Sequence, residues 1–123
     1  MKAMKELEKA FFIAPEDTAV VMGSGDLPVL STPRAIAMAE NVSMLLAKEI
    51  TEFGETTVGT RIDFYHTKAS KVGTSIKVVS RLVAMEGKAL NFECRLVQGE
   101  ETVAHGTHVR YVVNEERFMS KLE

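Results

Sequence analysis

Three polar side chains, Thr32, Glu40 and His66, have types and positions that suit acid–base chemistry. Glu40 lies in an Ala- and Met-rich stretch, and a helical plot at about 100° per residue places it between Ile36 and Met44. A carboxylate among apolar neighbours is partly desolvated, which favours a role as base or nucleophile. The alternative interpretation is a helix-surface glutamate at a subunit contact, bonded to a neighbouring serine or backbone group.

His66 is expected at the end of a strand, where it points towards the core. It continues an alternating series that shares one strand face, namely Val58, Thr60, Ile62 and Phe64. A neutral imidazole in that place can transfer protons near pH 7. A structural histidine at the rim of the core is the alternative interpretation.

Thr32 precedes Pro33, and this pair predicts a helix whose N-cap is Thr32. Such a cap is a structural feature of many helices. The same position places a hydroxyl beside the helix N-terminal amides, which favour developing negative charge. Thr32 could therefore hold a water molecule or an acyl oxygen.

The other reactive side chains give weaker signals. His105 and His108 are expected on opposite faces of the last strand, so they do not form a metal-binding pair. Gly106 between them indicates a bulge or a close backbone approach. The single cysteine, Cys94, alternates with apolar residues and is expected in the core. No Cys/His set has the spacing of a zinc site, so the sequence predicts no metal.

Turn residues and apolar periodicity predict the elements that position these side chains. A long apolar helix is expected from Thr32 to about Ile50. A strand over residues 7–13 and a short extended or helical piece over 18–22 precede it, and four strands follow over about 55–67, 74–86, 88–98 and 101–113. The connections between these four strands are short and contain glycine, which predicts an antiparallel meander.

This order of elements predicts an α+β protein with the hotdog architecture, a curved antiparallel sheet wrapped around one long central helix. An antiparallel sheet buries one face, and the long helix is the only apolar segment able to cover it. The 123 residues are expected to form one domain, 1–123. Open sheet edges and apolar surface favour a homodimer, which could pair further into a tetramer.

The composition argues against several classes of function. Fifteen basic and 17 acidic side chains give a net charge of −2. The chain therefore lacks the basic surplus that is typical of nucleic-acid-binding proteins. No apolar run reaches ~18 residues, which argues against a membrane span. The mixed charges of the N-terminus lack the apolar core of a signal peptide, and with only one cysteine the sequence predicts a cytoplasmic protein.

Three stretches of the chain have the motifs and spacing of one protein family. They are residues 29–32 with Glu40 eight residues after Thr32, residues 58–60 with His66 seven residues after Gly59, and residues 106–110 followed by 116–118. In this order they resemble the hotdog-fold acyl-CoA thioesterases, specifically the fluoroacetyl-CoA thioesterase-like group. The resemblance covers about residues 7–121.

This resemblance implies an enzyme that hydrolyses a coenzyme A thioester, with no cofactor beyond the coenzyme A of its substrate. It implies that Thr32, Glu40 and His66 form the catalytic set and that Gly59 lines the acyl pocket. The fluoroacetyl-specific enzyme has a Phe-rich lid before its threonine, whereas residues 25–28 here contain no aromatic side chain. We therefore expect a different small or branched acyl group.

The coenzyme A phosphates should need cations. Lys68 and Lys71 follow His66 in the chain, and Arg110 lies on the last strand. These three side chains are candidates for phosphate contacts, and solvated surface charge is the alternative interpretation of each.

Helix geometry places a constraint on the catalytic set. If the helix begins at Pro33, eight residues separate Thr32 from Glu40 by about 12 Å along the axis. Either the regular helix begins later, or the site joins Thr32 of one chain to Glu40 of another, and we predict a site at a dimer interface. Two other functions fit the same residues: a hotdog hydratase or dehydratase acting on acyl thioesters, and a non-catalytic acyl-CoA-binding dimer.

Overall fold

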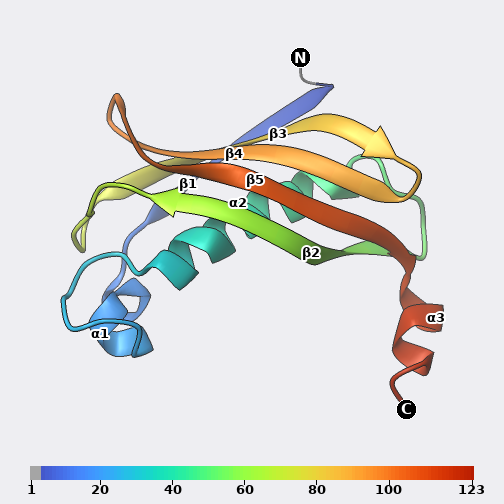
Figure 1. Cartoon of the computed structure of the whole chain (residues 1–123), viewed down its shortest axis with the longest axis horizontal. Helices are drawn as coiled ribbons and strands as arrows, with labels where there is room; N and C mark the ends of the chain where they lie inside the picture. Colours follow the sequence, from blue (N-terminus) through green and yellow to red (C-terminus); the bar gives the residue numbers. More distant parts are fainter. Residues whose placement is uncertain (1–3) are drawn as a thin grey trace.

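The chain folds into one sheet and one long helix, with two short helices at the ends of this core (Figure 1). The computed structural model describes residues 4–123. In chain order the elements are β1 (Lys5–Phe12), the 3-10 turn η1 (Pro15–Asp17), α1 (Ala19–Met22), α2 (Thr32–Lys48), β2 (Glu55–His66), β3 (Ser75–Glu86), β4 (Ala89–Gln98), β5 (Glu101–Asn114) and α3 (Glu115–Ser120). The ends of the long helix and of the strands lie within a few residues of the predicted ones.

The five strands form one antiparallel sheet in the order β1-β3-β4-β5-β2, and α2 lies across one face of it (Figure 1). Apolar side chains of the helix meet apolar side chains of the sheet in a single core, whose largest members include Met38, Leu46, Ile76, Leu82, Leu90, Phe92 and Leu96. Burial of this apolar surface is the main favourable term in folding. The architecture is the predicted hotdog fold.

The predicted meander of four consecutive strands is wrong, because β2 and β3 are not neighbours. β3, β4 and β5 do form a meander, but β2 pairs with β5 while β3 pairs with β1. The connection 67–74 runs from β2 at one edge of the sheet, past β5 and β4, to β3. Within this connection the carbonyl of Ser70 accepts a hydrogen bond from the Leu30 amide. β2 is therefore an edge strand, and its outer edge is unpaired within the described part of the chain.

A bulge in β2 changes which of its side chains face α2. The register against β5 shifts at Thr60, which is an extra residue in the strand. Simple alternation placed Val58 on the same face as Phe64, and this prediction is wrong. Gly59 faces the helix instead, since a Cβ there would lie 2.8 Å from the Glu40 carboxylate. Phe64 keeps its predicted direction and packs against the core.

Ser31, and not Thr32 as predicted, caps the N-terminus of α2. The Ser31 Oγ accepts a hydrogen bond from the Arg34 amide at 3.1 Å, and Thr32 is the first helical residue. Serine and threonine are both strong N-caps, so adjacent Ser and Thr leave two registers open in the sequence. Because Ser31 takes the cap role, the Thr32 hydroxyl is free to bind elsewhere.

β5 confirms the predictions for the last strand. His105 is exposed on the outer face of the sheet, whereas His108 is buried on the helix side. At Gly106 a Cβ would collide with the Asp63 carbonyl oxygen, so the predicted close backbone approach is present. Cys94 is buried in the core, as predicted.

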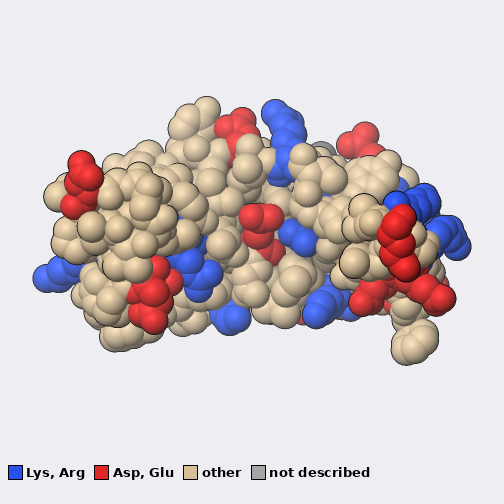
Figure 2. Space-filling model, turned by 90° about the horizontal axis from the view of Figure 1, so that it is seen from below, with Lys and Arg blue, Asp and Glu red and all other residues tan. Residues whose placement is uncertain are grey.

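The side of the molecule below β2 carries charges of both signs. Figure 2 shows acidic and basic side chains scattered among uncharged ones on this side, without a continuous basic stripe. None of the helices within residues 4–123 is long and apolar enough to cross a membrane.

Candidate active site

Thr32 and His66 form a hydrogen-bonded pair where the start of α2 meets the end of β2. The Thr32 Oγ1 lies 2.9 Å from the His66 Nδ1. Both residues line a pocket of about 280 Å³, which we call the Thr32/His66 pocket; its other walls come from α1, the segment before α2 and the start of the connection after β2. The structure thus brings two of the three predicted catalytic residues together.

The His66 imidazole is poised to exchange protons. Burial lowers the pKa of His66, and an interaction with the Lys68 backbone partly offsets this effect. A lowered pKa keeps the ring neutral near pH 7, so that one nitrogen carries a proton and the other a lone pair. The Nε2 atom is buried and has no hydrogen-bond partner among the described residues. Buried polar atoms without a partner are rare, and they often belong to functional sites.

Glu40 lies in a second polar cluster, further along α2. Its Oε2 is 3.7 Å from the Arg110 Nη1 and 4.0 Å from the His108 Nε2. Gly59 on β2 packs against the same carboxylate. We call these four residues the Glu40 cluster. The Glu40 side chain is 42% exposed. In the single chain it is therefore less desolvated than we predicted from the apolar residues around it in the sequence.

The Thr32/His66 pocket and the Glu40 cluster are separate sites within one chain. α2 is continuous from Thr32, so the alternative in which the regular helix begins later is wrong. Eight residues of helix separate Thr32 from Glu40 by about 12 Å along the axis. The side chains of Thr32 and Glu40 therefore cannot meet in one protomer.

The predicted phosphate-binding cations have different environments. Lys68 lines the Thr32/His66 pocket and forms an ion pair with Glu101. Lys71 lies in the connection after β2, where its backbone bridges to Val29. The prediction for Arg110 is wrong. Its side chain is only 9% exposed and lies on the face of the sheet that α2 covers, so it is not a surface contact for a phosphate.

His108 and Arg110 belong to the Glu40 cluster, and sequence reasoning did not assign them there. The signal that could have found them is the alternation in β5, which puts Ala104, His108 and Arg110 on one face, all three buried. Arginine is seldom buried without a partner, so a buried position on this face requires an acidic group on the helix opposite. Glu40 is that group.

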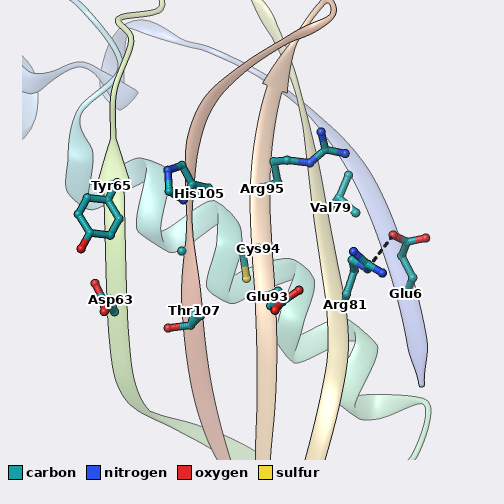
Figure 3. A pocket seen from close by; sticks show the side chains of 11 residues that line it. Glu6, Asp63, Tyr65, Val79, Arg81, Glu93, Cys94, Arg95, His105 and Thr107 are labelled. Atoms are coloured by element: carbon teal, nitrogen blue, oxygen red, sulfur yellow. Dashed lines mark ion pairs between the residues drawn. The ribbon is translucent and has the colours of Figure 1, made fainter. Parts of the chain in front are cut away.

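A separate hollow lies on the outer face of the sheet, away from α2 (Figure 3). It measures about 410 Å³, and charged side chains of both signs line it. Arg81 pairs with Glu6 at 3.6 Å, and Tyr65 stacks on His105 with ring centroids 5.4 Å apart. Neither the Thr32/His66 pocket nor the Glu40 cluster contributes to this hollow, so the candidate active site is on the helix side.

The described chain has the hotdog fold, with a Thr–His pair at the start of the central helix and a carboxylate further along it. A family model described as "Fluoroacetyl-CoA-specific thioesterase" matches residues 13–116. The chain belongs to this family, as its motifs predicted.

Named relatives and solved structures agree with this assignment. The fluoroacetyl-CoA thioesterase of Streptantibioticus cattleyicolor is 34% identical over 71 residues, which cover 58% of this chain and 51% of that relative. The match thus spans about half the length of the curated relative. A solved structure of the fluoroacetyl-CoA thioesterase FlK superposes with a TM-score of 0.91 at 25% identity, covering 99% of this chain and 95% of the other.

A more distant structure supports the fold alone. A thioesterase superfamily member from Thermus thermophilus superposes with a TM-score of 0.88 at 18% identity, covering 96% of this chain and 88% of the other.

Proposed function

We propose that this protein hydrolyses a small acyl-CoA thioester to the free acid and coenzyme A. The catalytic set is Thr32, Glu40 and His66, and coenzyme A enters as part of the substrate, with no separate cofactor. The observation that carries the proposal is the 2.9 Å hydrogen bond between Thr32 and His66 beside a pocket, with Glu40 on the same helix. Membership of the thioesterase family supports the same reaction.

The complete site forms between two copies of the chain in this proposal. β2 is an edge strand, and edge strands with free backbone groups pair readily with a second copy. An antiparallel two-fold pairing centred between Ile62 and Asp63 sets His66 of one copy opposite Gly59 of the other. Because Gly59 packs against Glu40, this pairing brings the carboxylate of one copy towards the Thr–His pair of its partner. The same contact desolvates Glu40, which is half exposed in the single chain.

The chemistry follows from these three groups. Glu40 takes a proton from water, whose oxygen attacks the thioester carbonyl carbon, or the carboxylate attacks that carbon itself. The carbon–sulfur bond then breaks, and His66 relays to the leaving thiolate the proton that Glu40 took from water. If the Glu40 carboxylate attacks instead, water then hydrolyses the acyl–Glu40 anhydride, and His66 relays the proton of that water to the thiolate. Thr32 and the α2 N-terminal amides hold water or stabilise the developing oxyanion. Each such role contributes roughly 10²–10³ in rate.

The pocket walls set the class of acyl group. The lining of the Thr32/His66 pocket includes the aliphatic side chains of Ala19, Val29, Leu30 and Pro33, and among the described residues it contains no Phe, Tyr or Trp. Aliphatic walls suit a small or branched acyl chain through apolar contact. In this proposal Gly59 leaves room for the acyl group beside Glu40, and Lys68 lies near enough to the pocket to contact a coenzyme A phosphate.

Thiol release from a panel of acyl-CoA substrates tests the function. We expect hydrolysis of at least one short or branched acyl-CoA, with no preference for fluoroacetyl-CoA over other short chains. Enoyl absorbance is followed in parallel, because a change there without thiol release identifies a hydratase or dehydratase. Tight binding of acyl-CoA without hydrolysis of any substrate in the panel contradicts the proposal and supports the interpretation as a binding protein.

The pH profile of hydrolysis depends on His66. Burial lowers the pKa of His66 below its usual value of about 6.5, so the neutral, active ring persists below that pH. The activity should therefore fall with a midpoint below pH 6.5, as the ring gains a proton. Rates at saturating substrate between pH 5 and 8 measure this decrease in activity. His105→Gln is the control and leaves the profile unchanged, whereas a loss of activity beginning above pH 7 contradicts the assignment.

A further inference from the structure

Arg110 is a buried cation with two kinds of contact. Its Nε donates to the Thr57 Oγ1 at 2.8 Å and its Nη2 to the Thr57 carbonyl at 3.1 Å. These bonds fix the guanidinium against β2 and direct the remaining nitrogen, Nη1, towards α2. A buried charge is costly unless it is paired, and Glu40 is the carboxylate within ion-pair range of Arg110 among the described residues.

His108 orients the same guanidinium. Its Nδ1 lies 2.7 Å from the Arg61 carbonyl oxygen, which can only accept, so Nδ1 carries the ring proton. The Nε2 lone pair then faces the Arg110 Nη1 at 3.2 Å and accepts from it. Burial is the main effect that lowers the pKa of His108, and the neighbouring Arg110 lowers it further, while the Arg61 carbonyl and Glu40 act in the opposite direction. The ring is therefore a neutral bridge near pH 7.

The two contacts leave little freedom to Nη1. Thr57 holds Arg110 from one side and His108 from the other, and both anchors are buried. Glu40 has the opposite character, because its side chain is 42% exposed and no hydrogen bond to it is present among the described residues at normal hydrogen-bond distance. A carboxylate that no hydrogen bond holds takes its position from the fixed cation beside it.

We propose that Arg110 is a positioning residue that holds the Glu40 carboxylate in its reactive orientation, and that His108 holds Arg110 in turn. This inference rests on the proposed function, because it assigns Glu40 to catalysis. Gly59 completes the arrangement, since a side chain there would occupy the space of the carboxylate. Arg110 acts from the same protomer as Glu40, and so prepares the carboxylate before a second copy completes the site.

A double-mutant cycle on turnover tests this role. Arg110→Met should lower kcat at least about 30-fold and change KM less than about 3-fold, because positioning acts on the chemical step. Arg110→Lys keeps the charge but loses the forked contacts to Thr57 and His108, so it should recover only part of the loss. In a Glu40→Gln background, Arg110→Met should cost less than about 3-fold, since residues that act through one group are not additive. An equal loss in both backgrounds overturns the proposal, as does a KM effect alone.

A second readout separates this proposal from the function on which it rests. The unfolding midpoints of the wild type, both single variants and the double variant form a stability cycle that needs no activity. Additive shifts overturn the Glu40–Arg110 contact even if the wild type hydrolyses acyl-CoA. Coupled shifts with no hydrolysis by the wild type overturn the proposed function, and the positioning role with it. Arg95→Met on the outer face is the matched control and should leave kcat unchanged.

Discussion

Glu40→Gln is expected to lower kcat at least about 100-fold while the protein remains folded. The substitution keeps the size of the side chain and removes its ability to take a proton or to attack a carbonyl carbon. Glu40 is half exposed and contributes no apolar burial to the core, so the fold should tolerate the amide. Thiol release at saturating acyl-CoA measures the loss, and circular dichroism with thermal unfolding checks the fold.

Glu49→Gln is the matched control for this prediction. Glu49 is the carboxylate at the C-cap of α2, where it forms an exposed ion pair with Lys5 at 3.0 Å. Exposed ion pairs contribute about 1 kcal/mol or less, so the control should keep both its fold and its turnover. Wild-type turnover by folded Glu40→Gln would show that the carboxylate does no chemistry. The protein would then be an acyl-CoA hydrolase of another mechanism.

Much of the fold could be predicted because its signals are local. The apolar Ala- and Met-rich stretch after Pro33 predicted α2, and alternation predicted the strands to within a few residues. The strand order could not be predicted in the same way, because the pairing of β2 with β5 joins residues that are distant in sequence. Short connections suggested a meander, and only the long-range contacts of the connection 67–74 show that it crosses over.

The sequence pattern did not indicate the bulge in β2. The residues around it, Gly59, Thr60 and Arg61, include no apolar side chain that would reveal a change of phase. The alternation therefore seemed to continue through Val58, which placed it on the wrong face. The bulge matters for the site, because it turns Gly59 towards Glu40 while the end of the strand still directs His66 towards Thr32.

The candidate site was predicted as separate residues rather than as a geometry. Sequence reasoning selected Thr32 and His66, but their 2.9 Å contact depends on Ser31 taking the cap role. Arg110 was predicted as a candidate phosphate contact, with solvated surface charge as the alternative interpretation. Its burial beside Glu40 could be recognised only with the alternation of β5 and the position of α2 known together.

The second large effect concerns a mixed dimer of two inactive variants. In the proposed assembly, each site takes Thr32 and His66 from one copy and Glu40 from the other. A dimer of one His66→Asn chain and one Glu40→Gln chain then contains one site with both defects and one site with none. Activity should return although each variant alone is inactive, because a two-fold interface makes the two sites reciprocal.

Turnover by this mixed dimer is the most direct test of the shared site. The two variants are co-expressed with different tags, and the mixed dimer is purified through both. We predict about half of the wild-type kcat per dimer, because one of two symmetric sites is intact. A mixed dimer of His66→Asn with Thr32→Val should remain inactive, because each of its sites lacks one member of the Thr–His pair. If the His66→Asn and Glu40→Gln dimer is as inactive as its parents, the two copies do not share a site, and the proposed joining of Glu40 to the partner's Thr–His pair is contradicted.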